Sequence, residues 1–317
     1  MTAETTQIPD MVYAIACSPA FDRDGICFAA RYSGLEQSSD GGATWRSAYD
    51  SLGIDTPLAT LAVALSPDFE ADRSVFAGVA GGILRSFDGG DSWYSNALPA
   101  SPVISTLAVS PNFAHDGVVF AGTMEDGLLR SSDRGSQWSP WNFGLLDLGV
   151  ICLAVSPDFA NDETLCVGTS TGIFRSTNGG RAWREINLPL DYEPVLSLAL
   201  SPTYAVDGML FAGTEAHGLW TSADRGRTWI QVGADAIAGP VNNILLSPTF
   251  PQAPELLINL ATEILVSRDG GQAWNEPAAL PSPDTEVSSV AAPQGLGAGA
   301  SLLVGLVENG VLRLELR

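Results

Sequence analysis

One eight-residue motif recurs six times along the chain and limits the possible folds more than any other feature. It reads Ser-x-Asp-x-Gly-x-x-Trp, with Asn in place of Asp in the fourth copy, and we call it the box. Its tryptophans lie 45–48 residues apart, at Trp45, Trp93, Trp138, Trp183, Trp229 and Trp274. A fixed period of this length is typical of a repeat protein in which each repeat is one small sheet.

A second motif keeps the same phase, because an apolar run ends in Ser-Pro once in every unit. The copies are Ser18–Pro19, Ser66–Pro67, Ser110–Pro111, Ser156–Pro157, Ser201–Pro202 and Ser247–Pro248, with a degenerate seventh at Ala292–Pro293. Seven units in 317 residues predict an all-β, single-domain, seven-bladed β-propeller of four-stranded antiparallel blades. The predicted blades span about 12–54, 55–102, 103–149, 150–194, 195–240, 241–288, and 289–317 together with 2–9.

The fourth unit shows the expected strands, at residues 152–155, 165–169, 172–175 and 183–186. The last unit supplies three strands before the chain ends, and residues 2–8 stand where every other unit has its fourth strand. We therefore expect the N-terminal strand to complete the last blade in a 3+1 closure, which covers an exposed sheet edge.

The box has a structural explanation. Gly accepts the positive φ of a tight turn, the Asp carboxylate can accept backbone N–H groups of that turn, and the Trp ring can bury a large area. Six repeated acids resemble a calcium array, but each unit offers one box carboxylate and Ca²⁺ takes about six to eight oxygens. We predict no metal and no cofactor.

Charge excludes several function classes. The chain has 36 acidic and 15 basic residues, all of the latter Arg, and a formal net charge of −21. This negative charge repels the phosphate backbone, which argues against nucleic-acid binding. A chain without Lys cannot form a Schiff base through a lysine, which excludes enzymes of that mechanism. No apolar run approaches a membrane span, and Met1–Asp10 lacks the features of a secretory signal, which predicts a cytoplasmic protein. Cys17, Cys27, Cys152 and Cys166 are expected as reduced thiols.

The box resembles the Asp-box, or bacterial neuraminidase repeat, of β-propeller proteins. Proteins with this motif include sialidases, xyloglucan-cleaving hydrolases, sortilin-like receptor ectodomains and photosystem II assembly factors. The resemblance implies that the boxes lie on the face opposite a binding site. It does not favour sialidase activity, because the chain lacks Arg-Ile-Pro, has seven units rather than six, and keeps most arginines beside boxes. The hydrolases resemble tandem propellers, and this chain has one.

Two classes of loop should line the face opposite the boxes: the hairpins between the second and third strands, and the connections between units. The candidate ligand-binding residues in them are Arg31, Tyr32, Glu125, Asp126, Trp141, Tyr192, Glu215, His217, Glu263 and Glu308. Trp141 is expected as an exposed anchor for a partner, with packing over the next blade as the alternative. His217 and His115 are expected on opposite faces, which argues against a two-histidine site. No residue is assigned a catalytic role.

These features predict a non-enzymatic binding or assembly scaffold. Its partner would be a protein or a small polar, cationic or sugar-like ligand, and the chain would be a monomer that binds no nucleic acid and inserts into no membrane. The alternative is a glycoside hydrolase or lectin that uses funnel acids, such as Glu125 or Asp126 with Glu215 or Glu263. A third interpretation is an acidic surface without a ligand.

Overall fold

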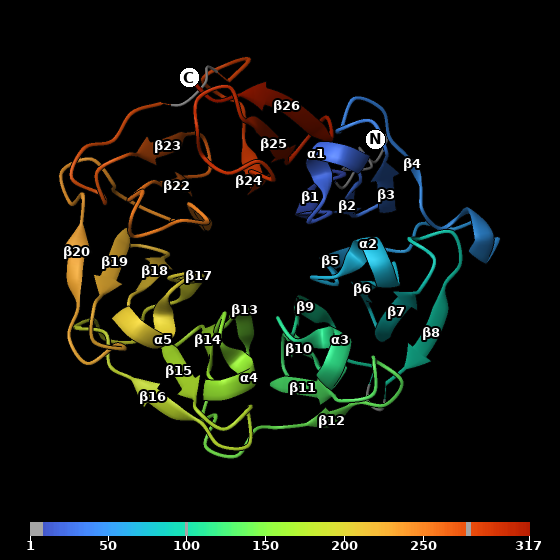
Figure 1. Cartoon of the computed structure of the whole chain (residues 1–317), viewed down its shortest axis with the longest axis horizontal. Helices are drawn as coiled ribbons and strands as arrows, with labels where there is room; N and C mark the ends of the chain where they lie inside the picture. Colours follow the sequence, from blue (N-terminus) through green and yellow to red (C-terminus); the bar gives the residue numbers. More distant parts are fainter. Residues whose placement is uncertain (1–8, 99–100, 277–279) are drawn as a thin grey trace, which may run out of the picture.

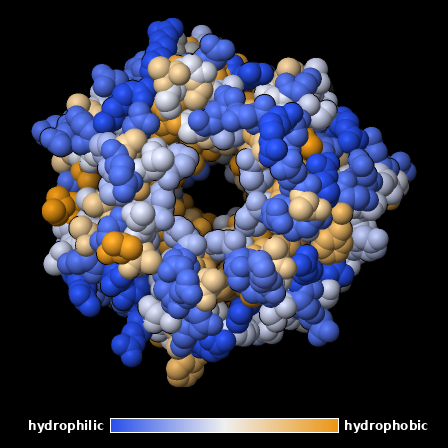
Figure 2. Space-filling view, in the orientation of Figure 1, coloured by the Kyte–Doolittle hydropathy of each residue, from blue (hydrophilic) through white to orange (hydrophobic). Residues whose placement is uncertain are grey.

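The computed structural model describes residues 9–98, 101–276 and 280–317. Seven antiparallel sheets stand around a central channel (Figure 1), which confirms the predicted seven-bladed β-propeller. The channel is open on the face that Figure 2 shows. No helix in the described part of the chain is long and apolar enough to cross a bilayer.

The first five blades each contain four strands, in chain order from the channel outward. Blade 1 has β1 (Val12–Cys17), β2 (Cys27–Arg31), β3 (Gly34–Ser38) and β4 (Arg46–Ser47), and blade 2 has β5 (Thr60–Leu65), β6 (Val75–Val79), β7 (Gly82–Ser86) and β8 (Tyr94–Ala97). Blade 3 has β9 (Ile104–Val109), β10 (Val119–Thr123), β11 (Leu128–Ser131) and β12 (Ser139–Pro140). Blade 4 has β13 (Val150–Val155), β14 (Leu165–Thr169), β15 (Ile173–Ser176) and β16 (Arg184–Ile186), and blade 5 has β17 (Val195–Leu200), β18 (Leu210–Thr214), β19 (Leu219–Ser222) and β20 (Ile230–Val232).

The last two blades have shorter outer parts. Blade 6 has β21 (Asn243–Leu246), β22 (Leu256–Asn259) and β23 (Ile264–Ser267), and blade 7 has β24 (Val287–Ala291), β25 (Ser301–Leu306) and β26 (Val311–Glu315). In blade 6 a single bridge between Val266 and Asn275 stands in the position of the fourth strand. The predicted fourth strand of blade 7, residues 2–8, lies outside the described residues.

Within the described residues, five short helical turns each follow an innermost strand, and our sequence analysis did not anticipate them. They are α1 (Phe21–Asp24), α2 (Phe69–Asp72), α3 (Phe113–Asp116), α4 (Phe159–Asp162) and α5 (Tyr204–Asp207), and Figure 1 shows them around the channel. A 3-10 turn, Asp50–Leu52, lies between blades 1 and 2. In each helical turn the serine of the Ser-Pro pair donates a hydrogen bond of 2.6–2.7 Å to the aspartate six residues later. The aromatic residue that begins each turn is buried.

The box makes the hydrogen bonds expected of it. The Ser38 hydroxyl donates to Asp40 Oδ1 (2.8 Å) and accepts from the Gly42 N–H (2.9 Å). Asp40 accepts the N–H groups of Ala43 (3.0 Å) and Thr44 (2.9 Å). In blade 4 Asn178 accepts the same kinds of bond from Ser176 and Ala182. The carboxylate charge is therefore not needed to form the turn.

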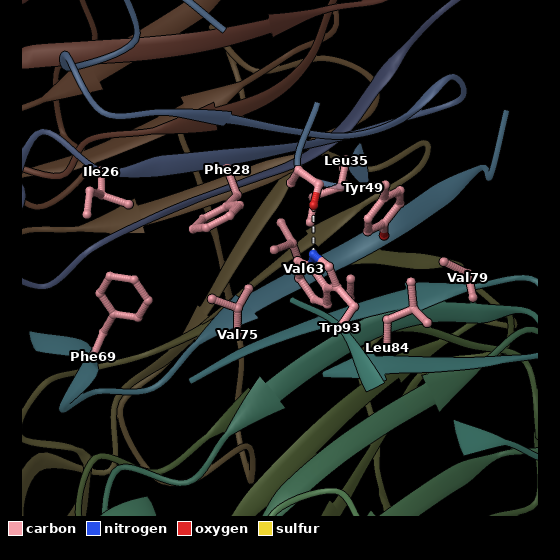
Figure 3. Packing of buried hydrophobic residues seen from close by; sticks show 13 residues of the cluster. Ile26, Phe28, Leu35, Tyr49, Val63, Phe69, Val75, Val79, Leu84 and Trp93 are labelled. Carbon is pink, nitrogen blue, oxygen red and sulfur yellow. Dashed lines mark hydrogen bonds between the residues drawn. The ribbon is translucent and has the colours of Figure 1, made fainter. Parts of the chain in front are cut away.

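Each box also packs against the preceding blade. A Cβ atom on the box glycine Gly90 would lie 2.9 Å from the Phe28 ring, and one on Gly135 would lie 2.8 Å from the Phe76 ring. Both glycines have positive φ. Figure 3 shows the core between blades 1 and 2, where Trp93 Nε1 donates to the Ala48 carbonyl at 2.7 Å. The boxes thus hold neighbouring blades together.

A long polar side chain strengthens several of these contacts. Arg85 and Arg175 donate to the backbone carbonyls of Arg134 and Arg225 in the next box. Gln37 occupies the same strand position in blade 1 and donates to the Gly89 carbonyl at 2.9 Å. Our sequence analysis did not identify this glutamine.

Boxes and helical turns share one face, because the N–H of Gly41 in the box donates to the carbonyl of Gly25 after α1. We call this the box face and the opposite one the loop face. The loop face carries the hairpins between second and third strands and the connections between blades. His115 lies in α3 on the box face and His217 lies in the β18–β19 hairpin on the loop face, as predicted.

Acid should weaken the boxes. Hydrogen bonds from the Thr228 side chain and backbone, and from Ser222, lower the pKa of Asp224 to about 2. A depressed folded-state pKa stabilises the protein above the unfolded value of about 3.9, and this contribution is lost as the pH falls toward 2. We expect Asp224→Asn to be less stable than the wild type at neutral pH, with the difference shrinking between about pH 4 and pH 2. Urea unfolding of both proteins at several pH values measures this difference in the free energy of unfolding. The exposed Asp235→Asn is the control, and a difference that is constant with pH would contradict the prediction.

The predicted 3+1 closure stays a prediction, because residues 2–8 lie outside the described part of the chain. Asp10 forms an ion pair with Arg31 at 2.8 Å, and a Cβ on Gly310, in the β25–β26 hairpin, would lie 3.5 Å from the Arg31 guanidinium. Deletion of residues 2–8 should lower the single melting transition of the ring by about 5 °C or more. Thr6→Pro, which removes one backbone donor, should give a smaller shift. An unchanged melting temperature in calorimetry would refute the 3+1 closure.

Candidate functional site

The predicted site residues lie on the loop face but in separate groups. Arg31 ends β2 and Tyr32 follows it, Glu125 and Asp126 lie in the β10–β11 hairpin, and Glu215 and His217 lie in the β18–β19 hairpin. Glu263 precedes β23, Glu308 lies in the β25–β26 hairpin, and Tyr192 lies in the connection between blades 4 and 5.

Arg31 is engaged within the fold. Its guanidinium lies 2.8 Å from Asp10 and 2.5 Å from Glu36, and its side chain is 16% exposed. Tyr32 and Asp10 lie near Tyr13. Burial is the main cause of the raised pKa of Tyr13, and the charges of Tyr32 and Asp10 raise this pKa further. Arg31 therefore links the entry of the chain to blade 1 rather than presenting a free cation.

We expected Trp141 to be exposed, but its side chain is half-buried. The Arg130 guanidinium lies 4.1 Å and the Arg181 guanidinium 5.5 Å from a Trp141 ring centroid. The Trp141 carbonyl accepts a 2.7 Å hydrogen bond from Trp183 Nε1 in the next blade. Trp141 thus joins blades 3 and 4, which was the alternative interpretation of this residue.

Tyr192, Glu215 and His217 come together around Glu193. Glu193 is 6% exposed, and its carboxylate accepts the Ala216 N–H at 2.7 Å and lies 2.9 Å from His217 Nδ1. The Glu215 N–H donates to the Pro194 carbonyl at 3.0 Å. These bonds fix the blade 5 hairpin against the connection that carries Tyr192.

A groove of ≈ 730 Å³ lies next to this cluster, and we call it the blade 4 groove. Its walls are residues 146–148, 170–172, 187–188 and 190–193, with Phe174, Glu185 and Ile186. The groove is therefore built from both connections that flank blade 4 and from the β14–β15 hairpin.

Asp147 holds one wall of this groove in place. Its carboxylate accepts the Gly149 N–H at 2.9 Å and the hydroxyls of Ser170 at 2.7 Å and Thr171 at 2.9 Å. Burial opposes ionisation, but these hydrogen bonds prevail and lower the pKa of Asp147. Asp147 is consequently anionic at neutral pH.

Large apolar side chains stand exposed around the groove. Leu146 is 81% and Leu148 38% exposed on one wall, and Tyr192 is 83% exposed on another. Phe143, in the same connection as Leu146, is 81% exposed, and Met124 in the adjoining hairpin is 51% exposed. Sequence reasoning included the connections but missed Leu146, Leu148 and Glu185, because apolar residues in a loop and an acid on an outer strand carry no distinguishing pattern.

Two further predicted acids, Glu263 and Glu308, line other grooves of the loop face. Glu263 and Glu276 line one of ≈ 270 Å³, and Glu308 lines one of ≈ 620 Å³ with Glu286 and Asp284. In residues 9–98, 101–276 and 280–317 no three His, Cys, Asp or Glu side chains are grouped so as to hold a metal ion.

No protein-family model and no curated protein matches this sequence, so membership of the Asp-box family stays a prediction. Solved structures do share the fold. The GH74 xyloglucanase from Xanthomonas campestris is 19% identical with a TM-score of 0.72, and the GH74 enzyme of Niastella koreensis is 16% identical with 0.75; each match covers 96% of this chain and 52% of that one. YCF48 bound to D1 peptide is 17% identical with a TM-score of 0.69, covering 98% of this chain and 94% of that one. This chain spans about half the length of the two GH74 enzymes.

Arg31 should matter for stability. Arg31→Leu leaves Asp10 and Glu36 without their shared cation, so we expect a loss of about 1–2 kcal/mol in the free energy of unfolding. Arg184→Leu, which removes an exposed arginine, is the matched control and should change stability by less than about 0.5 kcal/mol. Urea denaturation measures both, and equal effects of the two variants would contradict a structural role for Arg31.

Proposed function

We propose that this chain is a non-enzymatic binding scaffold that holds a protein partner on its loop face. The exposed side chains of Leu146 and Tyr192, which line one groove of the loop face, carry the proposal. Each is more than 80% exposed, so the fold itself gains little from burying them, whereas a partner that covers them would. Clustered exposed apolar surface is typical of a protein interface.

The structural likeness and the charge support the same function. YCF48, whose length this chain nearly matches, is described bound to a D1 peptide. A net charge of −21 favours a positively charged partner and disfavours nucleic acid. A monomeric state and a cytoplasmic location stay predictions.

A carbohydrate-active function is the second candidate. The likeness to GH74 enzymes favours it, as does the groove that Glu263 and Glu276 share. A glycoside hydrolase needs two carboxyl groups about 5–9.5 Å apart, one of them protonated. Release of reducing sugar from xyloglucan by the purified chain, abolished in Glu263→Gln, would establish this function in place of the scaffold.

Site-specific photo-crosslinking tests the scaffold function. Benzoylphenylalanine at Leu146 on the loop face should give protein adducts in an extract of the source cells, and excess unlabelled chain should suppress them. The same group at Val206 in α5, which is 88% exposed on the box face, is the matched control and should give none. Adducts from Val206 alone, or none from Leu146, would refute a partner on the loop face.

A further inference from the structure

We infer that the blade 4 groove binds an extended protein segment in which apolar side chains alternate with Lys or Arg. This inference rests on the proposed scaffold function and assigns it a site and a partner chemistry. Three independent observations support it: a strained aromatic residue, an acidic lining and aliphatic walls.

Tyr192 combines two unfavourable properties. Its φ of 49° lies in the left-handed region, which costs a non-glycine residue about 1–2 kcal/mol. Its side chain is 83% exposed and makes no hydrogen bond or ring contact within the described residues. Among the non-glycine residues with positive φ in those ranges, it is the one aromatic. Glycine would fit this backbone better, so the fold does not explain the tyrosine, whereas a ligand that covers the ring would.

The lining of the groove selects a cationic ligand. Asp147, Glu185, Asp191 and Glu193 line it, and none of the residues in its walls is basic. Glu193 is occupied by His217, but Glu185 and Asp191 are exposed and form no ion pair in the described part of the chain. Carboxylates that share a concave surface attract cations more strongly than the same charges spread over a convex one. Lys and Arg side chains fit this requirement.

The walls favour a peptide over a sugar. Leu146 and Leu148 contribute branched aliphatic side chains to the lining of the groove, from the connection between blades 3 and 4. Aliphatic surface gains free energy by covering other apolar side chains, about 25 cal/mol for each Å² removed from water. A volume of ≈ 730 Å³ accommodates several side chains of an extended segment. Successive side chains of an extended segment point to opposite sides. A segment that alternates apolar and basic residues would therefore place its apolar side chains against Leu146 and Tyr192 and its cations against the carboxylates.

Fluorescence anisotropy with designed peptides tests the site. The probe is a fluorescein-labelled twelve-residue peptide of alternating Leu and Lys, compared with alternating Leu and Glu and with alternating Gly and Lys. At an ionic strength of about 0.15 M we expect the Leu-Lys peptide to bind at least about tenfold more tightly than either of the others. Tighter binding of the Gly-Lys peptide, or no binding of the Leu-Lys peptide at millimolar concentration, would overturn the inference.

Two groove variants localise the binding. Tyr192→Gly should weaken it about tenfold while the melting temperature stays equal or rises, because the backbone strain is removed. Glu185→Gln/Asp191→Asn should weaken it about fivefold or more. The control is Asp50→Asn/Asp55→Asn, which removes two charges from the corresponding groove of blade 1 and should leave the affinity near that of the wild type.

The outcomes separate the two proposals. Equal losses in the two double variants, or an unchanged affinity in Tyr192→Gly, would show that net charge alone binds the peptide and would overturn the groove. The scaffold function would then still stand if crosslinks form from Leu146. Absence of both crosslinks and peptide binding would refute the scaffold function itself.

Discussion

The contact between each box and the preceding blade is the interaction on which the rest of the structure depends. A sheet in the ring is covered on both faces only if its neighbours pack against it. The box glycines allow this close approach, since a side chain at Gly90 or Gly135 would collide with Phe28 or Phe76. The serine and the aspartate or asparagine of the box hold the turn in shape by hydrogen bonds, and Gln37, Arg85 and Arg175 reach across to the next turn. Because every blade needs two neighbours, closure of the ring is a condition for the stability of each of them.

Concentrating these contacts on the box face leaves the loop face less constrained. The hairpins and connections there need only satisfy their own backbone groups, so they can differ between blades. The connections that flank blade 4 illustrate this freedom, because they expose Phe143, Leu146 and Tyr192. A repeated structural face opposite a variable face suits a scaffold, in which function depends on loops held by a rigid framework.

The sequence was sufficient to predict the elements that repeat. Six boxes and seven apolar runs gave the number of blades, and Gly and Asp-Gly pairs gave the turns. The sequence did not reveal α1 to α5, because a four-residue turn is too short to show a helical periodicity. The only pattern that could have indicated these turns is the serine of the Ser-Pro pair followed six residues later by an aspartate. Trp141 was expected at the surface because Arg130 and Arg181, which cover it, come from different blades. The strain at Tyr192 could not be foreseen either, since the backbone of an irregular connection follows from tertiary contacts.

Tyr192 also shows how exposure and strain can be weighed together. Each alone has an ordinary explanation, because surfaces carry single apolar residues and loops contain positive φ angles. Together they impose a cost in backbone conformation without any packing gain in the isolated chain. A partner that covers the ring at an expected 25 cal/mol per Å² would repay about 1–2 kcal/mol with roughly 40–80 Å² of buried surface, less than one aromatic side chain can bury. The strain is thus of a size that binding can offset.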